Sequence, residues 1–197
     1  MTKMRMRTNW LVAILIALAA CGGENPGVGG PSDRENYPAG PYGTTDGATI
    51  ANLSFQTLEG EPFELDKDVF KDPHNRVLLL SSVAGWCAPC REEQPLLKSW
   101  YEKYKDRGLI IVEALFENNE RQQATAADLQ AWQKQYKLPF PVTLDPEFKL
   151  EPFFASGSPT PPLSVLVRVD DMKILKVVVG TGNEQLIESI ILANLPR

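Results

Sequence analysis

The sequence has few of the residues that metal sites and nucleic-acid binding require. Only three cysteines and one histidine occur among its 197 residues, too few for a four-ligand zinc site once Cys21 is assigned elsewhere. The formal net charge is −5 and no basic patch is present, which argues against nucleic acid as a partner. No internal repeat is visible. The chemistry must therefore rest on a small number of residues.

The first 21 residues have the pattern of an export signal. Basic residues precede an apolar run over residues 10–20, which is too short for a stable membrane-spanning helix. Leu18-Ala19-Ala20-Cys21 resembles the lipobox of bacterial lipoproteins, which implies cleavage before Cys21 and its lipidation. An ordinary signal peptide with an incidental cysteine is the alternative. The lipoprotein interpretation places a lipid-anchored protein in the bacterial cell envelope, facing the periplasm. Because glycine rather than aspartate follows Cys21, the same resemblance favours the outer membrane.

Composition divides the rest of the chain into a linker and a domain. Gly, Pro, Ser, Asn and Asp dominate residues 22–47, and apolar residues are too sparse there to bury a core. We therefore predict a flexible linker that tethers the domain to the membrane. Residues 48–197 have the size of a single domain.

The most informative stretch is Trp86-Cys87-Ala88-Pro89-Cys90. It follows an apolar run, Val77–Leu80, that predicts a buried strand, and it precedes a segment that predicts a helix. A cysteine at a helix N-terminus has a lowered thiol pKa, because unpaired N–H groups and the helix dipole stabilise its thiolate. The Cys87 thiolate would attack a disulfide, and Cys90 would then close a ring with it. Half of a zinc site and a purely structural disulfide are the alternatives.

Hydrophobic periodicity predicts an α/β domain with a β-hairpin ahead of its core. Apolar and polar residues alternate over 48–65, with a turn at Glu59-Gly60. Longer apolar runs and helical stripes alternate after that, which favours a sheet covered on both faces. The further predicted strands are 77–80, 109–116, a short one within 138–145, 163–169 and 174–179, and the predicted helices are 91–107, 127–137 and 183–195.

Residues 86–95 resemble the signature of the TlpA-like branch of the thioredoxin superfamily, which includes the ResA-type thiol–disulfide oxidoreductases. They match Trp-Cys-x-Pro-Cys-Arg/Lys-x-Glu-x-Pro at every fixed position, and weaker matches extend the resemblance over about residues 50–195. The resemblance implies a thioredoxin-like fold, with a central mixed β-sheet flanked by helices and an N-terminal hairpin extension. It also implies that Cys87 attacks and Cys90 resolves. No cofactor or metal is expected, since the dithiol carries the chemistry itself.

The resemblance gives roles to two more residues of the motif. Glu93 falls where the family has an acidic residue near the redox pair, and it would move a proton at Cys90 as a general acid or base. A solvated residue in an ion pair is the alternative for Glu93. Trp86 would shield the disulfide and offer partners a flat contact.

The superfamily also has a cis-proline that faces the disulfide, beside which an extended partner peptide forms backbone hydrogen bonds. The candidates here are Pro159, Pro161 and Pro162. We favour Thr160-Pro161, because this choice leaves the following strand freer of proline. Pro162 is the least favoured, because the residue before it has no N–H to donate.

Two positions differ from what the superfamily leads one to expect. Ser81 occupies the place of thioredoxin's buried aspartate, and a hydroxyl is a poor base. Deprotonation of Cys90 must then depend on water, on Glu93 or on a group that the sequence does not reveal. His74 lies beside Pro73 in a polar segment, and we predict a surface residue.

These observations favour a membrane-anchored, extracytoplasmic enzyme that reduces disulfides of exported partner proteins and is re-reduced by a membrane electron donor. A thiol oxidant is an alternative, because the motif does not fix the reduction potential. A thiol peroxidase is disfavoured because Ala84, not Thr or Ser, stands three residues before Cys87. A copper-chaperone-like binding protein is disfavoured by the short cysteine spacing and by a histidine, His74, that precedes the pair.

Overall fold

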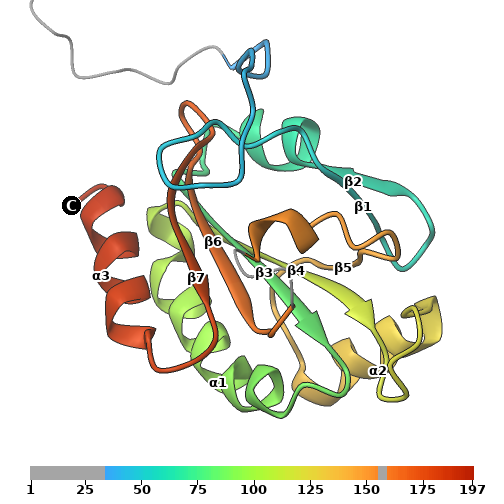
Figure 1. Ribbon diagram of the computed structural model, residues 1–197. Coiled ribbons are helices and arrows are strands. Elements are labelled where there is room, and N and C mark those ends of the chain that lie inside the picture. The colour runs from blue at the N-terminus through green and yellow to red at the C-terminus, as the bar shows by residue number, and fades with distance from the viewer. Residues whose placement is uncertain (1–33, 155–158) are drawn as a thin grey trace, which may run out of the picture. The chain divides into compact units, whose positions relative to one another are not determined.

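The domain is built on a seven-stranded mixed β-sheet (Figure 1). The computed structural model describes residues 34–154 and 159–197, so Cys21 and the predicted export signal lie outside the described residues. The strand order is β2-β1-β5-β4-β3-β6-β7. The strands are β1 (Ser54–Gln56), β2 (Pro62–Glu64), β3 (Val77–Ala84), β4 (Leu109–Glu117), β5 (Val142–Leu144), β6 (Leu163–Arg168) and β7 (Lys173–Val179), and the helices are α1 (Ala88–Tyr104), α2 (Ala126–Tyr136) and α3 (Glu184–Asn194).

The predicted fold class is confirmed, including the hairpin ahead of the core. β1 and β2 pair antiparallel, and β1 joins the sheet through β5. β3, β4 and β5 run parallel to one another, and β6 and β7 complete the other side of the sheet as an antiparallel hairpin. Across the described ranges, none of the helices combines the length and the apolar character needed to span a membrane.

β3 is the centre of the sheet and is buried along its whole length. It lies between β4, which is parallel to it, and β6, which is antiparallel. The predicted strand, Val77–Leu80, ends too early, because Ser81 and Ser82 interrupt the apolar run although both are fully buried. The extra residues carry β3 up to the start of the cysteine motif.

α1 begins at the motif and ends near Gly108. Pro89 lies in its first turn, where the missing N–H costs no hydrogen bond, and the helix continues through Pro95. A 3₁₀ turn, Lys105–Arg107, follows its last residue, Tyr104. Gly108 then takes a φ of +98°, and a Cβ there would lie 2.7 Å from the carbonyl oxygen of His74. Only glycine fits this reversal into β4.

Two clusters of apolar side chains pack on opposite faces of the sheet. Successive residues alternate between them, so Leu79 and Ile111 belong to one cluster and Leu80 and Val112 to the other. The first cluster includes side chains of α1, α2 and α3, which together cover one face (Figure 1). The second is closed by residues of the N-terminal part of the domain and by a short π-helix, Leu65–Phe70.

The chain packs on the domain from Arg34 onward. The Arg34 guanidinium donates to the carbonyl oxygens of Phe70, at 3.0 Å, and of Asn75, at 2.8 Å, and it pairs with the carboxylate of Asp170. The side chain of Asp46 accepts from the Val177 amide at 2.9 Å. The predicted linker over residues 22–47 is therefore too long at its C-terminal end. The polar composition of this segment gives no sign that it packs on the domain. The contacts of Arg34 are with backbone carbonyl groups that lie far away in the sequence.

Candidate active site

The two cysteines form a disulfide at the point where β3 passes into α1. Their Cα atoms lie 5.3 Å apart. Cys87 is the N-cap of α1, and its sulfur accepts a hydrogen bond from the Cys90 amide at 3.1 Å. This N–H is one of the four at a helix start without a partner inside the helix. The same donor would stabilise a thiolate on Cys87 after reduction of the disulfide. The predicted strand–motif–helix arrangement is thus confirmed.

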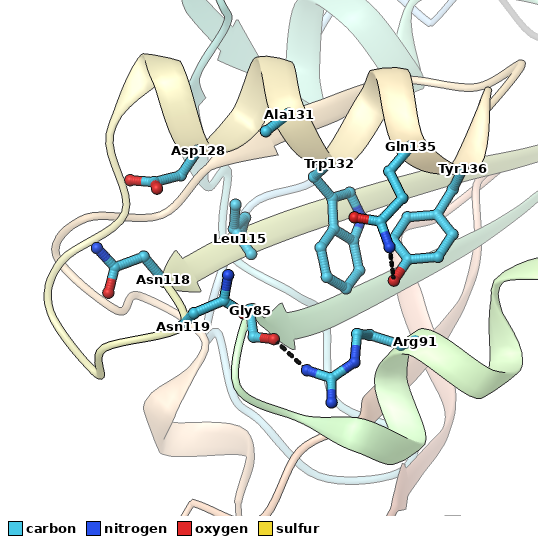
Figure 2. Close-up of a pocket in the computed structure, with 10 residues that line it drawn as sticks. All are labelled: Gly85, Arg91, Leu115, Asn118, Asn119, Asp128, Ala131, Trp132, Gln135 and Tyr136. Atoms are coloured by element: carbon cyan, nitrogen blue, oxygen red, sulfur yellow. Dashed lines mark hydrogen bonds between the residues drawn. The ribbon is translucent and has the colours of Figure 1, made fainter.

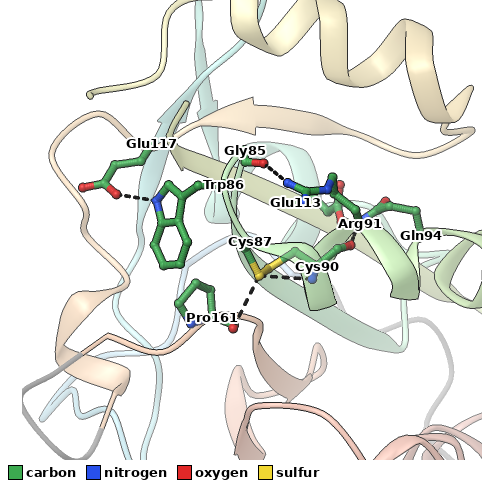
Figure 3. The surroundings of a disulfide bond; sticks show 9 residues. All are labelled: Gly85, Trp86, Cys87, Cys90, Arg91, Gln94, Glu113, Glu117 and Pro161. Carbon is green, nitrogen blue, oxygen red and sulfur yellow. Dashed lines mark hydrogen bonds between the residues drawn. A yellow bond between two sulfur atoms is a disulfide. The ribbon is translucent and has the colours of Figure 1, made fainter. Parts of the chain in front are cut away.

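Both cysteines are buried. Cys87 is 2% exposed and Cys90 is fully buried. Figure 3 shows Trp86 and Pro161 on one side of the disulfide, with Gln94 and Glu113 on the other. The Cys87 sulfur lies 3.4 Å from the Pro161 carbonyl oxygen. Trp86 and Pro161 thus form the edge of the site beside Cys87.

A cis peptide bond joins Pro161 to Pro162, so the prediction that Pro161 is the cis-proline is wrong. β6 begins only at Leu163, directly after Pro162, so the missing N–H of Pro162 costs the sheet no hydrogen bond. Pro161 faces Cys87 with its carbonyl group, so the missing N–H of Pro161 does not affect this contact. Thr160 is exposed beside it.

Trp86 is held in place by two charged residues, Glu117 at the end of β4 and Arg121 in the segment that follows it. Its indole N–H donates to the Glu117 carboxylate at 2.7 Å. The Arg121 guanidinium lies 3.9 Å from the ring centroid, a cation–π contact that covers one face of the indole. Glu117 and Arg121 were not among the predicted site residues, because a polar loop carries no sequence pattern that marks such a contact.

Glu93 lies on α1 within a turn of Cys90, and it is largely withdrawn from solvent. Burial, together with the negative charges of Glu113 and Glu184, raises the pKa of Glu93 to about 8. Its Oε1 atom is buried and has no hydrogen-bond partner in the described part of the chain. A carboxyl in this state holds a proton near neutral pH and can exchange it, as a general acid or base must.

A second buried carboxyl, Glu113 on β4, was missed by the sequence analysis. Its Oε1 accepts from Gln94 Nε2 at 2.6 Å and its Oε2 accepts from Trp132 Nε1 at 3.0 Å. Burial raises the pKa of Glu113 to about 7, although both hydrogen bonds favour the charged form. In the sheet Glu113 is the register partner of Ser81. A single acidic residue within the apolar run Leu109–Phe116 is the signal that could have identified it.

A small cavity opens beside the motif between the ends of β3 and β4 and the helix α2 (Figure 2). Its volume is about 70 Å³. Arg91 reaches across it to donate to the Gly85 carbonyl at 2.5 Å. Pockets for organic cofactors measure about 300–1,000 Å³, so the cavity is too small for one.

His74 lies away from the cysteines. Its Nε2 is 3.0 Å from the carbonyl oxygen of Lys105, which follows the C-terminal end of α1, whereas the motif is at the N-terminal end. Within residues 34–154 and 159–197, no three His, Cys, Asp or Glu side chains are grouped so that they could hold a metal ion.

Comparison with known proteins agrees with this geometry. The model of the AhpC/TSA family matches residues 47–161. The thioredoxin-like protein YneN of Bacillus subtilis is 28% identical over 140 residues, which cover 71% of this chain and 74% of that protein. The thiol-disulfide oxidoreductase ResA of Bacillus cereus is 28% identical over 143 residues, which cover 72% of this chain and 74% of that protein.

Solved structures with the same fold include proteins of thiol–disulfide chemistry. A putative thiol:disulfide interchange protein DsbE from Chlorobium tepidum has a TM-score of 0.59 at 23% identity, over 78% of this chain and 98% of that one. StoA from Bacillus subtilis has a TM-score of 0.53 at 23% identity, over 72% of this chain and 96% of that one. The thioredoxin-like resemblance is therefore confirmed, and the cysteine pair makes the protein a thiol–disulfide oxidoreductase. The chain belongs to the AhpC/TSA family.

Proposed function

We propose that this oxidoreductase reduces disulfides in exported partner proteins while a lipid on Cys21 anchors it to the membrane. The observation that carries the exchange chemistry is the place of Cys87, whose sulfur caps α1 and accepts the Cys90 N–H. A sulfur in this position gains stability when it becomes a thiolate, and the thiolate is the attacking form.

The reaction begins with the dithiol form of the enzyme. The Cys87 thiolate attacks one sulfur of the partner's disulfide, forms a mixed disulfide and displaces the other partner sulfur as a thiolate. Cys90 then loses its proton and attacks the Cys87 sulfur, which closes the Cys87–Cys90 bond and releases the second partner thiolate. Two electrons pass to the partner, whose two thiolates take up two protons. A membrane dithiol donor returns two electrons to the enzyme.

In its carboxylate form, Glu93 is the proposed acceptor of the Cys90 proton. It follows Cys90 within one turn of α1, and its unpartnered Oε1 is free of competing hydrogen bonds in the described residues. A pKa of about 8 is close to that of a thiol, so the proton transfer is nearly balanced in free energy.

Trp86, Thr160 and Pro161 form the proposed contact for a partner peptide. An extended segment lying beside Pro161 would place its own sulfur next to Cys87, because the Pro161 carbonyl lies 3.4 Å from that sulfur. Pro161 offers only its carbonyl to the peptide, since proline has no N–H. Exposed Thr160 extends the same edge, and the indole of Trp86 bounds it.

The anchor and the cellular site are proposed from the N-terminal sequence. Lipidation of Cys21 would hold the protein in the bacterial envelope with its domain facing the periplasm, and the glycines after Cys21 favour the outer membrane. A solved relative in fold is described as a secreted disulfide oxidoreductase of Mycobacterium tuberculosis. Replacing Cys21 by serine should move the protein from the membrane fraction to the soluble fraction.

Variants of the two cysteines test the exchange. Cys90→Ser should accumulate a mixed disulfide with a peptide that contains a disulfide, because the resolving attack is removed. Cys87→Ser should form none, which makes it the matched control. Equal adduct formation by both variants would contradict the assignment of Cys87 as the attacking thiol.

A further inference from the structure

Glu113 is a buried carboxyl without a cation partner. It lies within β4 and is fully buried, and no salt bridge to it occurs in residues 34–154 and 159–197. Placing an ionisable group in a protein core without a counter-charge is costly, and such groups gather at functional sites. An apolar residue would continue the strand at lower cost, so the carboxyl needs another explanation.

Glu113 belongs to a row of polar residues on the sheet face that α1 covers. In register, Glu113 of β4 is opposite Ser81 of β3, and Ser81 is opposite Ser164 of β6. The flanking positions on this face, among them Leu79 and Ile111, belong to the apolar cluster that includes Cys87 and Cys90. The Ser81 hydroxyl has no hydrogen-bond partner in the described chain. The polar interruption of the core thus occurs next to the redox pair.

Gln94 connects the buried carboxyl to the resolving cysteine. Its Nε2 donates both to Glu113 Oε1, at 2.6 Å, and to the backbone carbonyl of Cys90, at 2.9 Å (Figure 3). Trp132 Nε1 holds the second carboxyl oxygen at 3.0 Å. Both carboxyl oxygens accept from N–H donors, so protonation of Glu113 weakens one of these bonds. The charge state of Glu113 is therefore linked to the main chain at Cys90.

In the part of the chain that the structure describes, the titratable groups that respond to the charge of Glu113 lie on helices. α1 contributes Glu93 and Arg91, and α2 contributes Tyr136, whose pKa the negative charge of Glu113 helps to raise. α3 contributes Glu184, which acts on Glu93. The neighbouring strands β3 and β5 carry no titratable side chain. Burial raises the pKa of both carboxyls, and a negative charge on Glu113 helps to hold the proton on Glu93.

We propose that Glu113 is a positioning residue for the exchange reaction: through Gln94 it fixes the main chain of Cys90, and its buried charge acts on Glu93, the residue next to Gln94. This proposal rests on the exchange chemistry at Cys87 and Cys90 proposed above, and it is independent of the direction of electron flow. When Cys90 attacks the mixed disulfide, its proton passes to Glu93 in the carboxylate form, while Glu113 keeps its own charge. Glu113 therefore provides, from β4, the buried acid that Ser81 cannot provide from β3.

The first test measures the proton affinity of Glu93 in the oxidised full chain. Side-chain carboxyl carbon NMR shifts give its titration directly, in the wild type and in Glu113→Gln. Removal of the buried charge should shift the Glu93 titration to lower pH. Glu92→Gln is the matched control, because it removes an exposed carboxylate from the next position of the same helix. It should leave the Glu93 titration in place.

The second test follows the attack of Cys90. Reduced protein mixed with an aromatic disulfide reagent releases one chromophoric thiolate when Cys87 attacks and a second when Cys90 attacks. At about pH 9, above the Glu93 pKa of about 8, Glu93 is a carboxylate in both proteins, and Glu113→Gln should slow the second release by a factor of about three to ten, since the weaker base accepts protons less readily. The first release should be unaffected. An unchanged second release together with an unchanged Glu93 titration would overturn the proposal.

Trp132→Phe provides a second variant in case Glu113→Gln does not fold. This variant removes the donor to Glu113 Oε2 and retains an aromatic ring. Without that hydrogen bond Glu113 should ionise at higher pH, and its effect on Glu93 should therefore also appear at higher pH. If neither the Glu113 nor the Glu93 titration moved to higher pH in this variant, the proposal would be contradicted. Loss of the first thiolate release, by contrast, would contradict the exchange function itself and not the role of Glu113.

Discussion

Replacing Glu113 by glutamine should flatten the decline of the domain's stability between pH 5 and pH 8. The folded state holds the proton on this carboxyl more tightly than the unfolded chain does, because burial raises its pKa. Folding is therefore favoured most below the unfolded pKa of 4.5, and this contribution is lost as the pH rises through about 7. Glutamine matches the neutral acid in shape and does not titrate.

The magnitude follows from the difference between the two pKa values. A change from 4.5 to about 7, at about 1.36 kcal/mol per unit, gives Glu113 a contribution of roughly 3 kcal/mol at low pH. About 2 to 3 kcal/mol of this should disappear between pH 5 and pH 8 in the wild type. Glu93 adds a decline of the same sign, which also becomes smaller in the variant, because the charge that raises its pKa is gone.

Urea unfolding of the oxidised protein at the two pH values measures the effect. The quantity to compare is the change in unfolding free energy from pH 5 to pH 8, because a constant offset caused by the amide cancels in that difference. Glu92→Gln controls for the loss of a carboxylate at the surface. A Glu113→Gln variant that loses as much stability over this range as the wild type would refute a buried, proton-holding Glu113.

Three further substitutions test how the site and its frame are held. Arg121→Ala removes the guanidinium from the face of Trp86, so the unfolding free energy should fall by about 0.5–1 kcal/mol and the emission of Trp86 should shift to the red. Gly85→Ala places a Cβ 2.8 Å from the backbone carbonyl carbon of Asn118 and from the backbone nitrogen of Asn119. Thermal unfolding should show a loss of about 1–3 kcal/mol, and wild-type stability would contradict the close approach. Arg34→Ala leaves buried carbonyl oxygens without their donor. A loss of about 1–3 kcal/mol in urea unfolding is expected, whereas no loss would mean that this segment is not anchored.

The fold could be predicted from the sequence because its strands and helices follow strong local patterns. The apolar run at Val77 and the helical stripe after Cys90 lie in one domain with a recognisable motif between them, and this order restricts the topology to few choices. The sequence was less informative where polar residues are buried. Ser81 and Ser82 interrupt the apolar pattern, so the end of β3 was placed too early.

The parts of the site that depend on contacts between distant segments could not be read from the sequence. The cis bond at Pro162 lies directly before the first residue of β6. Local sequence patterns do not determine the first residue of a strand to within one position. The link from Glu113 to Cys90 joins β4 to α1 through a glutamine that the family pattern leaves unspecified. Arg121 and Trp86 meet only because a polar loop folds back over the motif.

The most direct test of the central claim is the equilibrium reduction potential of the Cys87–Cys90 pair. The protein is equilibrated in glutathione or dithiothreitol buffers of graded ratio, and the redox state is followed by the fluorescence of Trp86 next to the disulfide. A reductase should give a reversible two-electron transition near or below about −270 mV. A potential near about −120 mV would make the protein a thiol oxidant and contradict the proposed reducing function.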